Sequence, residues 1–74
     1  MVETTRTLIG KQIRTLREKK GLTLNQLALM IGTERSYLGK IETGRVNTSI
    51  DKLERIAKGL DMTLFDFFYT FRDK

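Results

Sequence analysis

The sequence contains no cysteine, no histidine and no proline. Without the first two, disulfides and metal sites built on thiolate or imidazole ligands are excluded. A catalytic cysteine, a histidine base and a serine–histidine–aspartate triad are excluded as well. A chain of 74 residues has room for one domain, and so small a domain rarely encloses a substrate pocket. We therefore expect no enzyme activity, no cofactor, no metal and no small-molecule ligand.

Long apolar runs are also missing. No stretch approaches the roughly 18 apolar residues that a membrane helix needs. The residues from Met1 to Arg6 lack the apolar segment of a signal peptide. We expect a soluble cytoplasmic protein without a membrane partner, whose small core depends on tight helix packing or on oligomerisation.

The basic excess lies in one part of the chain. Residues 1–45 carry nine Lys and Arg against four Asp and Glu, which accounts for the whole formal net charge of +5. Residues 46–74 carry five of each sign. A one-sided basic excess suggests a polyanionic partner such as nucleic acid. An ordinary solvated surface explains the charge equally well. The pattern of the helices has to decide between these two interpretations of the charge.

Apolar residues recur at helical spacing in five segments, and no segment alternates with the period of a strand. The approximate ranges of these segments are 5–20, 23–32, 33–44, 48–60 and 63–71. The expected N-caps are Thr5 or Thr7, Thr23, a residue near Thr33 or Glu34, Thr48 or Ser49, and Thr63. Gln26 and Asp66 stand at the spacing of a capping box. Short connections between these helices predict one compact all-α domain over residues 1–74.

The second and third helices are joined by a short segment around Gly32 and Thr33. A glycine-containing joint between two short helices is typical of a helix-turn-helix, here at about residues 23–42. If Leu38 and Ile41 face the core, the opposite face presents Arg35, Ser36, Gly39 and Lys40.

Arginine and lysine on such a face can bind guanine or phosphate in the major groove, and serine can donate or accept a hydrogen bond. Gly39 has no side chain, so we expect it to let the helix approach a groove wall closely; an unconstrained solvent position is the alternative. Tyr37 lies between the two faces. Its ring is expected to pack on the first helix while its hydroxyl reaches a phosphate; pure packing is the alternative.

At this point the sequence resembles a known family. Residues 9–68 are similar to the Cro and phage-repressor (XRE-type) helix-turn-helix proteins of bacteria and phages. The matching positions are Leu27, Ala28, Gly32, Leu38, Ile41, Glu42, Gly44, Leu53, Ile56, Ala57 and Leu60. Within the family, the segment ERSYLGKIETGRVNTSI looks most like the controller proteins of restriction–modification systems. Stand-alone phage and plasmid repressors have similar segments.

The resemblance implies a role for each residue of the expected interface with double-stranded DNA. The recognition helix is about Glu34 to Glu42, within which Arg35, Ser36 and Lys40 match positions that touch bases or nearby phosphates. Phosphate contacts are implied for Tyr37, Arg45, Asn47 and the start of the second helix, Thr23 to Asn25. Thr33 completes the DNA-binding set.

Four positions need separate comment. The family often has glutamine as a phosphate anchor where this chain has Leu24, so the anchor must come from Thr23, Asn25 or the backbone. Glu34 suits the helix dipole but repels phosphate, unless it accepts a hydrogen bond from cytosine. Arg17 and Glu42 match a pair that joins the first and third helices in the family, so we expect a structural ion pair there.

The last segment is rich in aromatic residues. Leu64 and Phe67 can face the core, but the remaining aromatics of this short helix cannot all follow them. An exposed aromatic patch usually marks an interface. We expect a homodimer through this helix, with Phe65, Phe68 and Tyr69 at the interface, bound to a pseudo-palindromic operator. The alternative is that this helix is a C-terminal cap over the small core.

The predicted function is therefore that of a transcription regulator associated with the nucleoid. Other classes fit less well. An antitoxin-type interaction module would need a partner-binding extension, and Thr70–Lys74 is short for that purpose. RNA binding usually needs aromatic residues on the charged face, whereas here they lie in the neutral part of the chain.

Overall fold

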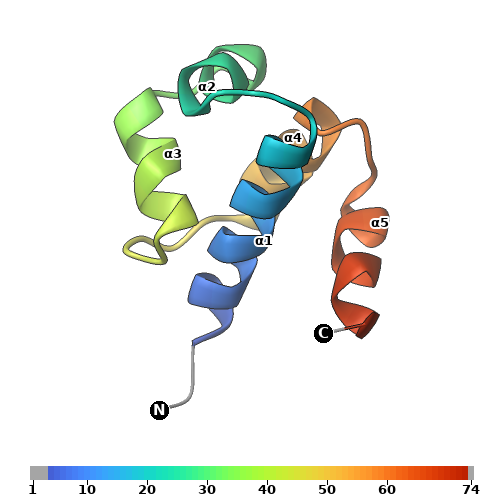
Figure 1. The fold of residues 1–74 in the computed structure, drawn as a ribbon. Coiled ribbons are helices and arrows are strands. Elements are labelled where there is room, and N and C mark those ends of the chain that lie inside the picture. Colours follow the sequence, from blue (N-terminus) through green and yellow to red (C-terminus); the bar gives the residue numbers. More distant parts are fainter. Residues whose placement is uncertain (1–3, 74) are drawn as a thin grey trace.

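The computed structural model describes residues 4–73, which form five α-helices and a terminal 3₁₀ segment (Figure 1). The helices are α1 (Thr5–Lys19), α2 (Leu24–Ile31), α3 (Arg35–Glu42), α4 (Ile50–Gly59) and α5 (Leu64–Tyr69), followed by η1 (Thr70–Asp73). No strand is present between residues 4 and 73. The expected all-α fold of five helices is confirmed.

Within the described residues, no helix combines the length and apolarity needed to cross a membrane.

Side chains cap the helix starts much as the sequence predicts. Thr23 and Thr63 each accept a hydrogen bond from the backbone N–H three residues later, and each closes a complete capping box. Ser49, one of the two expected candidates, caps α4. The prediction for α1 was wrong: Thr4 caps it, because its hydroxyl accepts a hydrogen bond from the Thr7 N–H and the helix begins earlier than expected. Glu34 precedes α3 without a side-chain cap.

The core is assembled from all five helices. Its buried apolar members are Ile13, Leu27, Ala28, Ile31, Leu38, Ile41, Leu53, Ile56, Ala57, Leu60 and Phe67. Phe67 is 1% exposed and fixes α5 to this core. The last helix is shorter than expected, since it ends at Tyr69 and Phe71 lies in the 3₁₀ segment, where it is partly buried against the core.

Helix α1 lies between α3 and the α5–η1 segment (Figure 1). On the α3 side, a Cβ atom at Gly10 would lie 2.3 Å from the carbonyl oxygen of Ile41 and 2.5 Å from that of Glu42. The backbones of α1 and α3 are therefore in direct contact, which only glycine permits. On the other side, the buried Gln12 donates from Nε2 to the hydroxyl of Thr70, 2.7 Å away. Helix α1 thus carries α3 on one side and the C-terminal segment on the other.

Candidate nucleic-acid interface

Arg17 and Glu42 form a largely buried ion pair that fixes the direction of α3. Arg17 Nε lies 2.7 Å from Glu42 Oε2, and Nη2 donates to Oε1 at 3.0 Å. The side chains are 11% and 5% exposed. Arg17 Nη1 also donates to the carbonyl of Leu22 at 2.8 Å, so three segments meet at this guanidinium. The hydrogen bond from Arg17 to Glu42 raises the pKa of Arg17 above its usual value, although burial opposes the effect.

Helix α3 presents three polar side chains to solvent. Leu38 and Ile41 are buried in the core, whereas Arg35, Ser36 and Lys40 are exposed. These three side chains are free to enter a groove about 12 Å wide, the width of the major groove of B-DNA. The face therefore presents two cations and a hydroxyl group. The orientation of the helix that carries them is fixed by the buried Arg17–Glu42 pair.

Gly39 is half-buried at the edge of this outward face that lies next to α2. A Cβ atom at Gly39 would lie 3.4 Å from Cδ2 of Leu24, at the start of α2. Gly39 therefore faces α2, and Leu24 packs against the core at the junction of the two helices. This packing explains the apolar residue at Leu24, where the resembling family often has glutamine. That Gly39 allows close approach to a groove wall stays a prediction.

Tyr37 lies on the other flank of α3, next to the connection between α3 and α4. Its hydroxyl donates to the carbonyl oxygen of Asn47 at 3.2 Å. The Nζ atom of Lys52 lies 5.5 Å from the centre of the Tyr37 ring, at cation–π distance. The hydroxyl therefore binds the α3–α4 loop. A phosphate was its predicted partner.

The remaining residues of the predicted DNA-binding set lie on either side of α3. The hydroxyl oxygen of Thr23 accepts a hydrogen bond from the Gln26 N–H at 3.0 Å, and its own proton stays available to donate. Asn25 and Arg45 are exposed, and Thr33 is partly exposed in the turn before α3. Thr33 donates its backbone N–H to the carbonyl of Ala28, which closes the end of α2.

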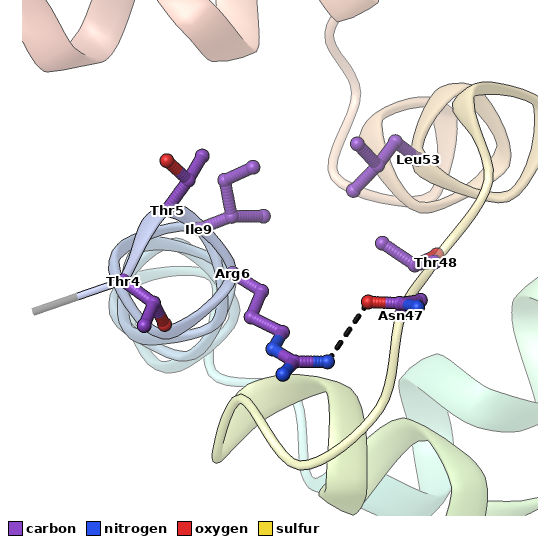
Figure 2. Close-up of a pocket in the computed structure, with 7 residues that line it drawn as sticks. All are labelled: Thr4, Thr5, Arg6, Ile9, Asn47, Thr48 and Leu53. Carbon is purple, nitrogen blue, oxygen red and sulfur yellow. Dashed lines mark hydrogen bonds between the residues drawn. The ribbon is translucent and has the colours of Figure 1, made fainter.

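Sequence reasoning missed two cations of this surface, Arg6 and Lys52. Arg6 Nη1 donates to Oδ1 of Asn47 at 2.8 Å, across 41 positions of sequence (Figure 2). Lys52 belongs to the part of the chain whose charges balance, but the fold brings it over Tyr37. The sequence carries no local signal for either placement, because each depends on how α1 and α4 pack around α3.

The aromatic residues expected at a dimer interface are exposed. Phe65 is 87% exposed, Tyr69 64% and Phe68 40%. Figure 1 shows α5, the helix that carries these residues, on the far side of α1 from α3.

The chain is similar to known proteins in sequence. A family model described as "Helix-turn-helix" (HTH_3) matches residues 13–67. The HTH-type transcriptional regulator SlrR of Bacillus subtilis (strain 168) is 40% identical over 62 residues, which cover 82% of this chain but 41% of SlrR. The control protein C.MunI of Mycoplasma sp is 38% identical over 60 residues, which cover 80% of this chain and 81% of C.MunI.

A solved structure extends the comparison. The restriction–modification controller protein C.Esp1396I, crystallised as a tetramer in complex with its natural operator, superposes with a TM-score of 0.84 at 32% identity. The match covers 92% of this chain and 91% of the controller. The family model and these relatives together show that the chain belongs to the HTH_3 family of helix-turn-helix proteins.

Proposed function

We propose that this chain is a transcription regulator that binds double-stranded DNA in a sequence-specific way. The observation that carries the proposal is the exposed face of α3, where Arg35, Ser36 and Lys40 stand on a helix fixed by the buried Arg17–Glu42 pair. Arginine can bind O6 and N7 of guanine with two hydrogen bonds, and such a contact discriminates between bases. The start of α2 and the α3–α4 loop then face the two phosphate backbones beside the groove.

The active species in this proposal is a homodimer joined through Phe65, Phe68 and Tyr69. Two symmetric recognition helices about 34 Å apart fit successive major grooves on one side of the duplex, which makes the operator pseudo-palindromic. The exposed aromatic patch on α5 supports this arrangement. The relative C.Esp1396I is a tetramer on its operator, which also favours a multimer on DNA.

The finer assignment is that of a restriction–modification controller acting in the cytoplasm. The similarity to C.MunI supports it, since the match extends over most of both chains. Selection of genomic fragments by the purified chain tests the assignment. A site upstream of the gene for this chain, beside genes for a methyltransferase and a nuclease, is the expected result. A site remote from such genes favours a stand-alone phage or plasmid repressor.

Arg35→Ala should weaken binding by about 1–3 kcal/mol at one specific base pair, because a bidentate base contact is lost. The probe is a duplex that the wild-type chain enriches from a random-sequence library, together with single-base variants of it. Wild-type affinity should also fall steeply as salt rises, with a log–log slope of about −0.9 for each phosphate neutralised. Arg14→Ala removes an exposed arginine from α1 and serves as the control. Equal weakening on every variant duplex would make Arg35 a phosphate contact, and a flat salt response would refute the electrostatic part of the proposal.

Phe65→Glu should convert the dimer to monomers in sedimentation velocity, because it places a charge in an apolar interface. The domain itself should stay folded, since Phe65 is 87% exposed in one protomer. Leu29→Glu is the matched control, as Leu29 is 73% exposed on α2, away from the patch. A Phe65→Glu chain that sediments as a dimer would place the interface elsewhere.

A further inference from the structure

We propose that Arg6, in the first turn of α1, is a further DNA-contacting residue. Together with Asn47 it forms a clamp for one backbone phosphate on the loop side of α3. The inference rests on the proposed function, and it adds to the interface a residue outside the helix-turn-helix. Its ligand is a phosphate of duplex DNA, and its effect is on affinity for every sequence alike.

The position of Arg6 is fixed by a close approach of two backbones. Gly44, directly after α3, has a φ of +73°, and a Cβ atom there would lie 2.5 Å from Oγ1 and 2.9 Å from Cα of Thr7. The first turn of α1 is therefore seated against the end of the recognition helix. Because Arg6 immediately precedes Thr7, its side chain starts beside the α3–α4 loop. It therefore has only a short distance to span to reach Asn47 in that loop.

Arg6 and Asn47 orient each other at the surface. The guanidinium donates through Nη1 to Asn47 Oδ1 at 2.8 Å, and the Tyr37 hydroxyl donates to the Asn47 carbonyl at 3.2 Å (Figure 2 shows the first of these contacts). Since the amide oxygen of Asn47 faces Arg6, its NH₂ group points away from Arg6. A guanidinium has five N–H donors, and within residues 4–73 no second acceptor engages that of Arg6. Both groups are exposed, so they present further donors to solvent.

The clamp lies on the correct flank of α3 to meet a DNA strand. Gly39 faces α2 and Tyr37 faces the loop, and these residues are about 200° apart around the helix axis. The start of α2 and the Arg6–Asn47 clamp are therefore on opposite sides of α3. With α3 in the major groove, the strands that border the groove run along these two sides. The α2 side offers Thr23 and the first N–H groups of a helix, and the loop side offers the clamp.

The surroundings of the clamp favour an anion. Arg6 and Asn47 border an open hollow of about 400 Å³, which is also lined by Thr4, Thr5, Ile9, Thr48 and Leu53. No acidic side chain of the described chain lines this hollow (Figure 2). A guanidinium beside an amide, with hydroxyls nearby, matches the acceptor oxygens of a phosphate.

The test compares Arg6→Gln with Lys19→Gln. Lys19 is an exposed cation at the opposite end of α1, about 20 Å away along the helix axis, and its replacement removes the same charge. The probes are a duplex that the wild-type chain enriches from a random-sequence library and a scrambled duplex of equal length. Arg6→Gln should flatten the log–log salt slope by about 0.9 and weaken binding to both duplexes about fivefold at 0.15 M salt, relative to Lys19→Gln. Asn47→Ala should cost less affinity in the Arg6→Gln background than in the wild type.

The other outcomes separate a failure of the proposed function from a failure of the phosphate clamp. If the wild-type chain binds no duplex, the proposed function fails. If the wild type binds and Arg6→Gln matches Lys19→Gln in affinity and slope, the clamp alone is refuted. A weaker Arg6→Gln complex with an unchanged salt slope would make Arg6 only a structural tie for the loop, which also overturns the phosphate contact. Urea unfolding of both variants shows whether either change acts through stability.

Discussion

Replacing Gly10 with alanine should destabilise the chain by about 2 kcal/mol or more, because it forces α3 away from α1. The added Cβ would lie 2.3 and 2.5 Å from two carbonyl oxygens of α3, Ile41 O and Glu42 O. These are backbone atoms that cannot swing aside, so overpacking should cost about 3 kcal/mol or more. Alanine recovers about 1 kcal/mol through its higher helix propensity, which is too little to offset the clash. A domain of this size is stable by roughly 4–11 kcal/mol in total, so the loss is a large share.

Urea unfolding followed by circular dichroism measures the effect of Gly10→Ala. Gly39→Ala is the matched control, since its new Cβ would meet only Cδ2 of Leu24 at an ordinary 3.4 Å. That control should gain up to about 1 kcal/mol from helix propensity. If both variants were equally stable, the direct contact between the α1 and α3 backbones would not be a determinant of the fold.

Removing either partner of the Arg17–Glu42 pair should cost about 3–5 kcal/mol, because the remaining charge stays buried without its partner. Arg17→Met and Glu42→Leu are suitable single changes. The double variant should be more stable than either single one, since two apolar side chains can share the site. Because the pKa of Arg17 is raised by its hydrogen bond to Glu42, the contribution of the Arg17 guanidinium to stability is present at pH 7 and is lost as the pH rises into the strongly alkaline range.

A double-mutant cycle in urea at pH 7 measures this coupling. Arg14 and Glu18 form an exposed ion pair at 3.2 Å on α1 and supply the control cycle. Their coupling should be about 0.3–0.5 kcal/mol, as is usual for exposed pairs one helical turn apart. A coupling for Arg17 and Glu42 no larger than that of the control would show that burial does not strengthen the pair.

Local signals in the sequence were enough to predict most of the helices. Capping residues act within one turn, so the starts at Thr23 and Thr63 could be placed from spacing alone. The N-cap of α1 was predicted wrongly, because several threonines lie close together near its start. The cap is Thr4, whereas Thr5 or Thr7 was expected. The end of α5 was also placed too late, since the chain tightens into a 3₁₀ segment after Tyr69.

The candidate site was only partly predictable, because its geometry depends on contacts between distant segments. The exposure of Arg35 and Lys40 followed from the period of α3. The orientation of Gly39 toward Leu24 did not, since helical period cannot show which part of an outward arc a neighbouring helix covers. Arg6 reaches Asn47 across 41 positions, and no pattern in the sequence connects them.

The placement of α1 between α3 and the C-terminal segment has a consequence for operator choice. Glycine contacts bind α1 to α3 on one side, and the Gln12–Thr70 hydrogen bond and Phe67 hold the C-terminal segment on the other. In the proposed dimer, α1 therefore joins the subunit interface on α5 to the helix in the groove, α3. The distance between the two half-sites is then set by the angle at which the α5 patches meet, whereas the bases read are set by α3. Changes of spacing and changes of sequence preference would therefore arise through substitutions on opposite sides of α1.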